Sequence, residues 1–235
     1  MKYFSLILFG MFFMLISPLH AQFPDPPGDP DADYEQILTR DTFDNWEGDT
    51  EYWRFEDGKL IGEITEDNPL DQNTFFIWDR EVADFELKVE YRISPEGNSG
   101  INYRSEKVEG IDHALRGYQA DFDGPNKWSG QLYEERGREF LALRGQVTYV
   151  GKDDEPREIG STGEESELAS LVNDGWNEYH LIVQGNTLIH MLNGQVTAVV
   201  IDEGESAAED GLLGVQVHQG PPMKVEFRNF RFREL

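Results

Sequence analysis

The stretch Phe85-Glu86-Leu87-Lys88-Val89-Glu90-Tyr91-Arg92-Ile93 decides the fold class of this chain. Its apolar residues occupy every second position, and charged residues lie between them. A period of two is that of a β-strand with one buried and one solvated face. We therefore expect a long strand of antiparallel type, which packs into a core through its apolar side.

Turn signals extend this strand pattern along the chain. Asp57-Gly58, Gly185-Asn186 and Asn193-Gly194 each separate two apolar or alternating runs, and each pair accepts the positive φ of a tight hairpin turn. Helical periodicity is confined to a short acidic stretch, Glu164 to Leu171. The sequence thus predicts an all-β jelly-roll β-sandwich of two antiparallel sheets, because stacked sheets hide their apolar faces from water.

Composition narrows the classes of partner. The chain has 235 residues, with 20 Lys plus Arg against 46 Asp plus Glu, so its formal charge is −26. Such a charge repels nucleic acid and anionic membrane surfaces. The chain contains no cysteine, which excludes disulfides, thiol nucleophiles and cysteine zinc sites.

The N-terminus has the pattern of a secretory signal peptide, which we assign to residues 1–21. Lys2 precedes an apolar run over residues 3–16, and Ala21 supplies the small residue at the cleavage point. The run is shorter than the ~20 residues that span a bilayer, so we expect cleavage rather than anchoring, and no membrane span afterwards. The predicted location is periplasmic or extracellular.

Residues 22–36 are rich in proline and aspartate and read as a stiff, solvated leader. A single sandwich domain is expected over residues 37–235.

Polar side chains alternate with apolar ones in three further predicted strands. These polar residues are Asn102, Arg104, Gln119, Asp121, Gln216 and His218. On the concave face of a curved sheet they would bind a sugar, although each row taken alone also fits an ordinary solvated face. Trp128 and Tyr133 lie beside turns, where their rings can stack on sugar C–H faces.

Two acidic segments are candidates for a carboxylate at the sugar site or for a metal site. Of the pair Glu134-Glu135, one carboxylate is expected over a bound sugar and the other in solvent. Asp121-Phe122-Asp123-Gly124 begins like a calcium loop, but the twelfth position is Leu132, so a turn is the better interpretation. The sequence leaves open whether a divalent metal ion binds elsewhere in so acidic a chain.

Three segments together resemble a known family. The first is Gly97 to Arg104 and the second is Gly117 to Asp121. The third is a C-terminal series of four pieces, namely Trp176-Asn177, His190 to Gly194, Gly214 to His218, and Phe227-Arg228-Asn229-Phe230. In this order they are similar to the 3-keto-disaccharide hydrolases, secreted proteins with a concanavalin A-like lectin/glucanase sandwich. The resemblance covers about residues 38–235.

The resemblance implies a reaction that uses a ketone at C3 of a sugar. The ketone acidifies the C2 hydrogen, so a base can remove it, the C1 leaving group departs, and water adds. We expect His218 as the base, because imidazole accepts protons near neutral pH, with Asp121 or Glu134 as alternatives. Arg104, Asn102 and Gln216 would stabilise the oxyanion, whereas Gln119, Tyr133 and Trp128 would bind substrate.

Two other classes of protein fit the same residues. A noncatalytic, lectin-like glycan-binding module would use the same amides and aromatic rings without a tuned base. An adhesion or scaffold domain would need neither a sugar-binding cleft nor a catalytic base.

Overall fold

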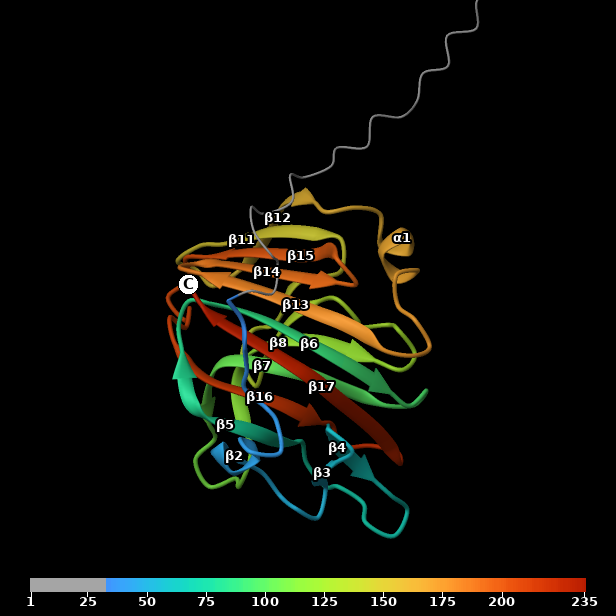
Figure 1. Cartoon of the computed structure of the whole chain (residues 1–235). Helices are drawn as coiled ribbons and strands as arrows, with labels where there is room; N and C mark the ends of the chain where they lie inside the picture. Colours follow the sequence, from blue (N-terminus) through green and yellow to red (C-terminus); the bar gives the residue numbers. More distant parts are fainter. Residues whose placement is uncertain (1–32) are drawn as a thin grey trace, which may run out of the picture. The chain divides into compact units, whose positions relative to one another are not determined.

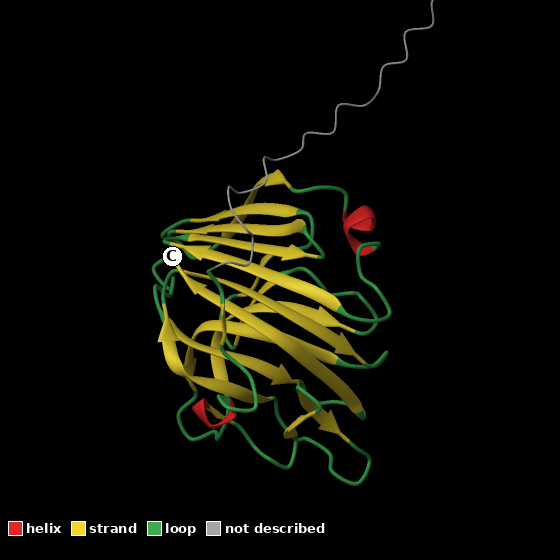
Figure 2. Cartoon of the chain, in the orientation of Figure 1, coloured by secondary structure: helices red, strands yellow, loops and turns green. Residues whose placement is uncertain are grey.

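A computed structural model describes residues 33–235 of the chain, and these form a sandwich of two β-sheets (Figures 1 and 2). The predicted signal peptide and the leader up to residue 32 lie outside the described residues. Within residues 33–235, helix is limited to a 3-10 turn, η1 (Phe43–Asn45), and to α1 (Glu165–Ala169), which lies within the short stretch predicted to be helical. The predicted fold class is therefore confirmed.

The larger sheet has ten strands in the order β12-β11-β15-β14-β13-β6-β17-β4-β3, with β1 paired to β17. Their bounds are β1 Glu35–Gln36, β3 Trp53–Glu56, β4 Lys59–Ile64, β6 Phe85–Ile93, β11 Gln146–Val150, β12 Pro156–Ser161, β13 Asn177–Gln184, β14 Thr187–Leu192, β15 Gln195–Asp202 and β17 Met223–Glu234.

The smaller sheet has seven strands in the order β10-β9-β8-β7-β16-β5-β2. Their bounds are β2 Trp46–Glu47, β5 Thr74–Val82, β7 Asn98–Lys107, β8 Leu115–Asp123, β9 Leu132–Glu135, β10 Glu139–Ala142 and β16 Gly211–Val217.

The alternating stretch forms β6, as predicted. Phe85, Leu87 and Val89 are fully buried, whereas the charged residues between them are partly exposed. The core lies between the two sheets and is rich in aromatic rings. Phe122 of β8, for example, meets Phe227 of β17 edge to face, with 5.9 Å between ring centroids. The burial of one face of each sheet thus holds the sandwich together.

The predicted hairpin turns also form. Asp57 and Gly58 join β3 to β4 with φ of 50° and 74°, and Asn193 and Gly194 join β14 to β15 with φ of 49° and 81°. Consecutive positive φ values match the right-handed twist of the flanking strands, and Asn, Asp and Gly adopt them at low cost.

Two details differ from the sequence-based expectation. β11 and β15 pair in parallel, so the larger sheet is not wholly antiparallel. The predicted leader also reaches too far, because Glu35 and Gln36 form β1 and pair with Phe232 and Arg231 of β17. Strand pairing with a distant segment thus orders residues whose local composition resembles a linker.

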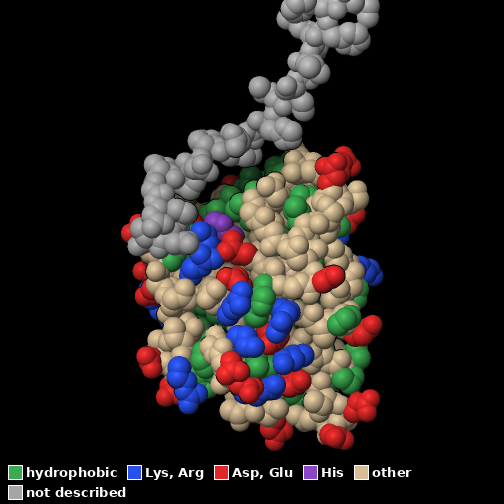
Figure 3. Space-filling view, turned by 45° about the vertical axis from the view of Figure 1, so that its right-hand side comes forward, with side chains coloured by type: hydrophobic (Ala, Val, Ile, Leu, Met, Phe, Trp, Pro, Cys, Tyr) green, Lys and Arg blue, Asp and Glu red, His purple; other side chains and the backbone are tan. Residues whose placement is uncertain are grey.

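The outer face of the larger sheet carries interleaved opposite charges (Figure 3). Arg228 contacts Glu90 at 2.6 Å, Arg233 contacts Glu86 at 2.7 Å, and a nitrogen of Arg92 lies 2.6 Å from Glu226. Partly exposed pairs of this kind add up to about 1 kcal/mol each. This face is therefore solvated, and the polar cleft belongs to the other sheet.

None of the helices in residues 33–235 has the length and apolarity needed to cross a bilayer.

Candidate functional site: an amide-lined cleft

A cleft of about 380 Å³ opens on the face of the seven-stranded sheet that points away from the core. We call it the amide cleft. Its lining residues are Asn73, Asn98, Gln119, Asp121, Trp128, Tyr133, Glu135, Glu139, Phe140 and His218.

Strand alternation places the polar residues of β8 in this cleft. Tyr118, Ala120 and Phe122 are buried in the core, so Gln119 and Asp121 must project from the opposite face of β8. β9 pairs with β8 and aligns Tyr133 with Gln119. The predicted polar row of β8 is therefore present, and β9 adds a second row beside it.

Hydrogen bonds connect the amides and carboxylates into one chain. Gln119 Nε2 donates to Asp121 Oδ1 at 2.8 Å, and Gln216 Nε2 donates to Gln119 Oε1 at 3.1 Å. The same Gln216 nitrogen lies 3.3 Å from Glu135 Oε2, and Asn73 Nδ2 donates to Glu135 Oε1 at 3.2 Å. Each side chain is thus held by its neighbour, which orients the cleft before a ligand enters.

Gly100 of β7 makes room for this chain. It pairs with Asp121, and the side chain of Gln119 lies over it. A Cβ on Gly100 would come within 2.5 to 2.9 Å of Gln119 Cγ, Cδ and Nε2. Only a glycine at this position therefore leaves Gln119 free to bridge Asp121 and Gln216.

Burial changes the acidity of Asp121. Loss of solvation raises the pKa of its carboxyl to about 8, the hydrogen bond from Gln119 opposes this rise, and the nearby carboxylates of Asp123 and Glu135 add to it. At neutral pH the carboxyl therefore carries a proton that it can donate. A pKa near the working pH is what acid–base catalysis requires.

His218 lies at the rim of the amide cleft, just after β16 ends, and is partly exposed. Its Nδ1 lies 2.6 Å from the carbonyl oxygen of Gln219. A carbonyl only accepts hydrogen bonds, so Nδ1 carries the hydrogen, and Nε2 of the neutral ring keeps its lone pair. The ring is thus held in the tautomer that can accept a proton through Nε2.

Three aromatic rings form one wall of the cleft. Phe140 stacks on Trp128 with 5.2 Å between centroids and meets Tyr133 edge to face at 5.0 Å. Burial, together with the charge of Glu135, raises the pKa of the Tyr133 hydroxyl, so that it stays protonated and can donate. Trp128 and Tyr133, which were expected to bind substrate, both line the amide cleft.

Asn102 and Gln216, which were expected to stabilise the oxyanion, are buried beneath the cleft and do not line it. Both side chains are fully buried, and Asn102 faces Gln119 across the β7–β8 pair. In the part of the chain that the structure describes, both amide atoms of Asn102 and the Oε1 of Gln216 lack a hydrogen-bond partner. Groups left unsatisfied in this way are uncommon and cluster here under a polar cleft.

Arg104 lies away from the amide cleft, contrary to the expected shared face with Asn102. A bulge interrupts the pairing of β7 after Tyr103, and Arg104 adopts a positive φ of 44°. Its guanidinium donates to the carbonyl oxygens of Ala83, Gly185 and Ala208 and pairs with Asp84 at 3.0 Å. The prediction of a shared face is wrong, because the bulge shifts the alternation by one position.

Glu134 points to the opposite side of β9 from the cleft. Its carboxylate accepts hydrogen bonds from the backbone and side chain of Arg138, and Arg138 also pairs with Asp202. Glu135 is the carboxylate that enters the cleft. Glu134, expected as an alternative base, therefore lies outside the cleft, and neither carboxylate of the pair is in solvent, since both side chains are buried. The side that a residue faces depends on the register of β9 against β8, which local sequence does not show.

Sequence reasoning did not identify Asn73, Asn98, Glu139 and Phe140 as cleft residues. Asn73 precedes β5 and reaches the cleft only because β5 pairs with β16. Phe140 comes from β10, a strand of four residues with no clear alternation. Of these residues, only Asn98 had a signal, as a member of the Gly97 to Arg104 segment.

A metal site was left open by the sequence. Within residues 33–235, no three His, Asp or Glu side chains lie together in a way that could hold a metal ion. Asp123, in the segment that begins like a calcium loop, instead accepts hydrogen bonds from the backbone of Lys127 and Trp128 at 3.0 and 2.7 Å. Its carboxylate thus stabilises the turn, as predicted.

Comparison with known structures identifies similar folds. A proposed glycosyl hydrolase from Parabacteroides distasonis has a TM-score of 0.57 at 14% identity, with 86% of this chain and 99% of that chain covered. The carbohydrate binding module CBM66 from Bacillus subtilis has a TM-score of 0.53 at 13% identity (81% and 96% covered). A Bacillus licheniformis beta-glucanase has a TM-score of 0.51 at 11% identity (86% and 97% covered).

No curated protein matches the sequence significantly. The model of one protein family, described as the 3-keto-alpha-glucoside-1,2-lyase-like domain, matches residues 36–233. This match covers almost the whole described sandwich, including every residue of the amide cleft. The chain therefore belongs to the family of 3-keto-alpha-glucoside-1,2-lyase-like domains.

Proposed function

We propose that this protein is a carbohydrate-active enzyme that cleaves the glycosidic bond of 3-keto-glycosides. The single observation that carries the proposal is a buried carboxyl, Asp121, whose pKa is raised to about 8 in a cleft lined by amides and aromatic rings. Family membership supports the substrate class. Folds shared with a beta-glucanase and a carbohydrate binding module are consistent with a sugar ligand.

The reaction begins with proton abstraction. His218 Nε2 takes the hydrogen from C2, and the electron pair of that C–H bond moves toward the C3 carbonyl to form an enolate. The Tyr133 hydroxyl, which has no hydrogen-bond partner among the described side chains, and the second hydrogen of Gln119 Nε2 are donors available to the enolate oxygen.

Elimination and hydration complete the cycle. The enolate collapses, the bond between C1 and the glycosidic oxygen breaks, and Asp121 donates its proton to the departing oxygen. Water then adds across the new C1–C2 double bond: the Asp121 carboxylate takes a proton from the water as its oxygen bonds to C1, and protonated His218 returns a hydrogen to C2, which gives the free 3-keto-sugar and restores both groups. One glycosidic bond and one water are consumed for each sugar and alcohol released.

The test compares a 3-keto-disaccharide with its unoxidised parent. We expect release of free 3-keto-glucose from the keto substrate only, and a loss of 10²- to 10⁴-fold in kcat/KM for His218→Ala and Asp121→Asn. His180→Ala and Asp153→Asn are matched controls. His180 pairs with Glu86 on the other sheet, and Asp153 is an exposed partner of Arg157. These controls should retain wild-type activity.

The pH profile distinguishes the two possible roles of Asp121. If it is the acid, it must be protonated, so kcat/KM falls as the pH rises through about 8, and Asp121→Asn removes this limb. If it is the base, the alternative from the sequence, kcat/KM rises through the same range. A profile that does not change in Asp121→Asn contradicts both roles.

A noncatalytic glycan-binding module is the second candidate function. The stacked wall of Trp128, Phe140 and Tyr133 favours it, because aromatic rings bind sugars without any chemistry. This function predicts that the keto-sugar and its parent both bind and that neither is turned over.

A further inference from the structure

The Phe227-Arg228-Asn229-Phe230 segment of β17 takes no part in the amide cleft. Pairing between β17 and β6 is interrupted by a bulge between Arg228 and Arg231, and Asn229 adopts a positive φ of 54° there. On its other edge, β17 pairs with β4 up to Phe227 and with β1 only from Arg231. The bulge therefore coincides with a gap between β4 and β1.

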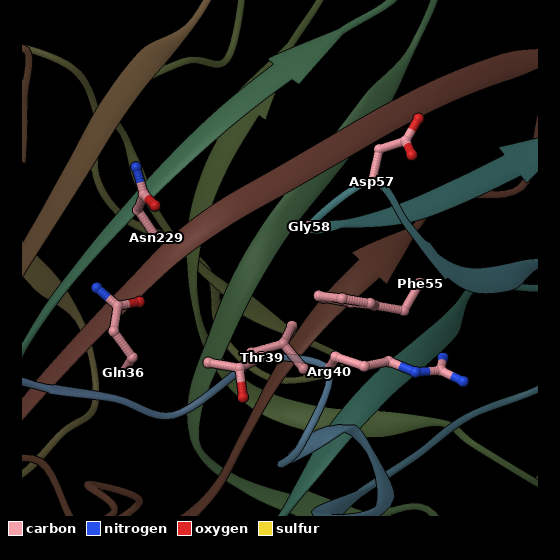
Figure 4. Close-up of a pocket in the computed structure, with 8 residues that line it drawn as sticks. Gln36, Thr39, Arg40, Phe55, Asp57, Gly58 and Asn229 are labelled. Carbon is pink, nitrogen blue, oxygen red and sulfur yellow. The ribbon is translucent and has the colours of Figure 1, made fainter.

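A hollow of about 600 Å³ lies at this gap (Figure 4). We call it the β17 hollow. It is lined by Gln36, Leu38, Thr39, Arg40, Phe55, Asp57, Gly58 and Asn229. It shares no residue with the amide cleft, and its side chains come from the larger sheet and the segments beside it.

One side of the β17 hollow is an aromatic ring held in place from behind. Phe55 is partly exposed, and its ring packs against Phe43 with 5.7 Å between centroids. Phe43 in turn stacks on the buried Phe76 at 5.1 Å. Phe55 thus presents a fixed ring to the hollow without the loss of side-chain freedom that a loose ring would suffer on binding.

Asn229 presents a free acceptor on the opposite side. Its Nδ2 donates to Glu90 Oε1 at 2.6 Å. A carboxylate only accepts hydrogen bonds, so the amide orientation is fixed, and Oδ1 has no donor among the described residues. In Figure 4 the side chains of Gln36 and Asn229 lie on one side of the hollow, and Phe55 and Asp57 lie on the other.

Thr39 Oγ1 is bonded to Thr42 at 3.1 Å, whereas three other polar side chains of the hollow have no partner within residues 33–235. This holds for the side chains of Gln36, Arg40 and Asp57, which are exposed to solvent. Together the wall offers one cation, one anion and two amides around an aromatic ring. A neutral, polyhydroxylated ligand can satisfy such a set, because each hydroxyl both donates and accepts.

We propose that the β17 hollow is a second carbohydrate-binding site, which takes a neutral saccharide unit separately from the amide cleft. An anionic ligand would meet Asp57 locally and the net charge of −26 at long range. An apolar ligand would find only Phe55 and Leu38 and would leave the charged groups unpaired. The site would hold a second saccharide unit at the larger sheet, apart from the amide cleft of the smaller one.

The test measures saccharide binding with the amide cleft disabled. Tyr133→Ala protein, otherwise the full mature chain, is titrated with sucrose, trehalose, maltose and cellobiose by saturation-transfer NMR. We expect at least one disaccharide to bind with a millimolar or lower Kd. Adding Arg40→Ala or Gln36→Ala should raise that Kd at least fivefold, whereas Arg116→Ala, an exposed arginine of β8, should leave it unchanged.

Other results overturn the proposal. They are the absence of binding by all four sugars in the Tyr133→Ala protein, or binding that persists unchanged in the Arg40→Ala and Gln36→Ala variants. Both hollow variants alter exposed side chains without partners, so loss of folding is not expected. Turnover of the keto-disaccharide by the Arg40→Ala protein tests the amide cleft alone, because Arg40 lies outside that cleft. The proposed function and the proposed second binding site can therefore fail independently.

Discussion

At the scale of single residues, Gly100 offers a test of how the amide cleft is organised. Gly100→Ala places a methyl group within 2.5 Å of Gln119, which must move away from Asp121 and Gln216. We expect kcat/KM to fall roughly tenfold to a hundredfold, since misplacement of about 1 Å in an active site has effects of this size. Steady-state kinetics on the keto-disaccharide measure the change.

Gly175→Ala is the matched control, because no atom lies within 4 Å of the added methyl group. In the Gly100→Ala variant, the fall of kcat/KM with rising pH should occur at a higher pH than in the wild type. The reason is that the hydrogen bond from Gln119, which this variant disturbs, lowers the pKa of Asp121. Unchanged kinetics in Gly100→Ala would contradict the role given to Gln119.

Asp121 also links stability to pH. Its folded pKa of about 8 lies above the ordinary 3.8, so the folded protein holds this proton more tightly than the unfolded chain does. The stabilisation is complete below about pH 4 and is lost as the pH rises through about 8. Relative to Asp121→Asn, the wild type should therefore lose on the order of a few kcal/mol across this window.

Urea denaturation of both proteins between pH 5.5 and 9 measures this difference. Asp153→Asn serves as the control, since Asp153 is exposed and its pair with Arg157 lowers its pKa, which leaves it ionised throughout this range. A constant difference in unfolding free energy between wild type and Asp121→Asn would show that Asp121 is not buried as a neutral acid.

At the scale of elements, the bulge in β7 turns Arg104 into a bridge between loops. Lysine cannot reproduce three bonds to carbonyl oxygens together with the pair to Asp84. Arg104→Lys should therefore reduce the unfolding free energy by about 1–3 kcal/mol. Thermal denaturation measures this effect.

The same variant separates the two roles of Arg104. We expect kcat/KM of the folded Arg104→Lys protein to remain within about threefold of wild type, because the guanidinium lies outside the amide cleft. A large loss of activity without loss of stability would restore the oxyanion role that the sequence suggested.

Pairing of elements also decides which residues of a strand are functional. Alternation correctly placed Gln119 and Asp121 opposite the core residues of β8. It placed Arg104 wrongly, because one bulge reverses the side on which later residues lie. Alternation in the sequence thus predicts which side of the sheet a side chain faces only up to the next β-bulge in the strand.

At the scale of the whole molecule, we propose that the protein acts outside the cytoplasm. The N-terminal 21 residues have the pattern of a signal peptide. Mature protein purified from the exported fraction should begin at Gln22, and N-terminal sequencing or intact mass spectrometry checks this. Recovery of exported protein that still carries Met1 would contradict the cleavage.

Local sequence patterns suffice to predict the all-β class, the buried face of β6, the positive-φ turns at Asp57-Gly58 and Asn193-Gly194, and the outward side chains of β8. These features depend on neighbours in the chain, through backbone sterics and the period of two. By contrast, the pairing of β9 with β8 determines that Glu135 rather than Glu134 enters the amide cleft. Asn73 and Gln216 contact Glu135 across 62 and 81 residues of chain, and strand order and register, which no local pattern encodes, bring them together.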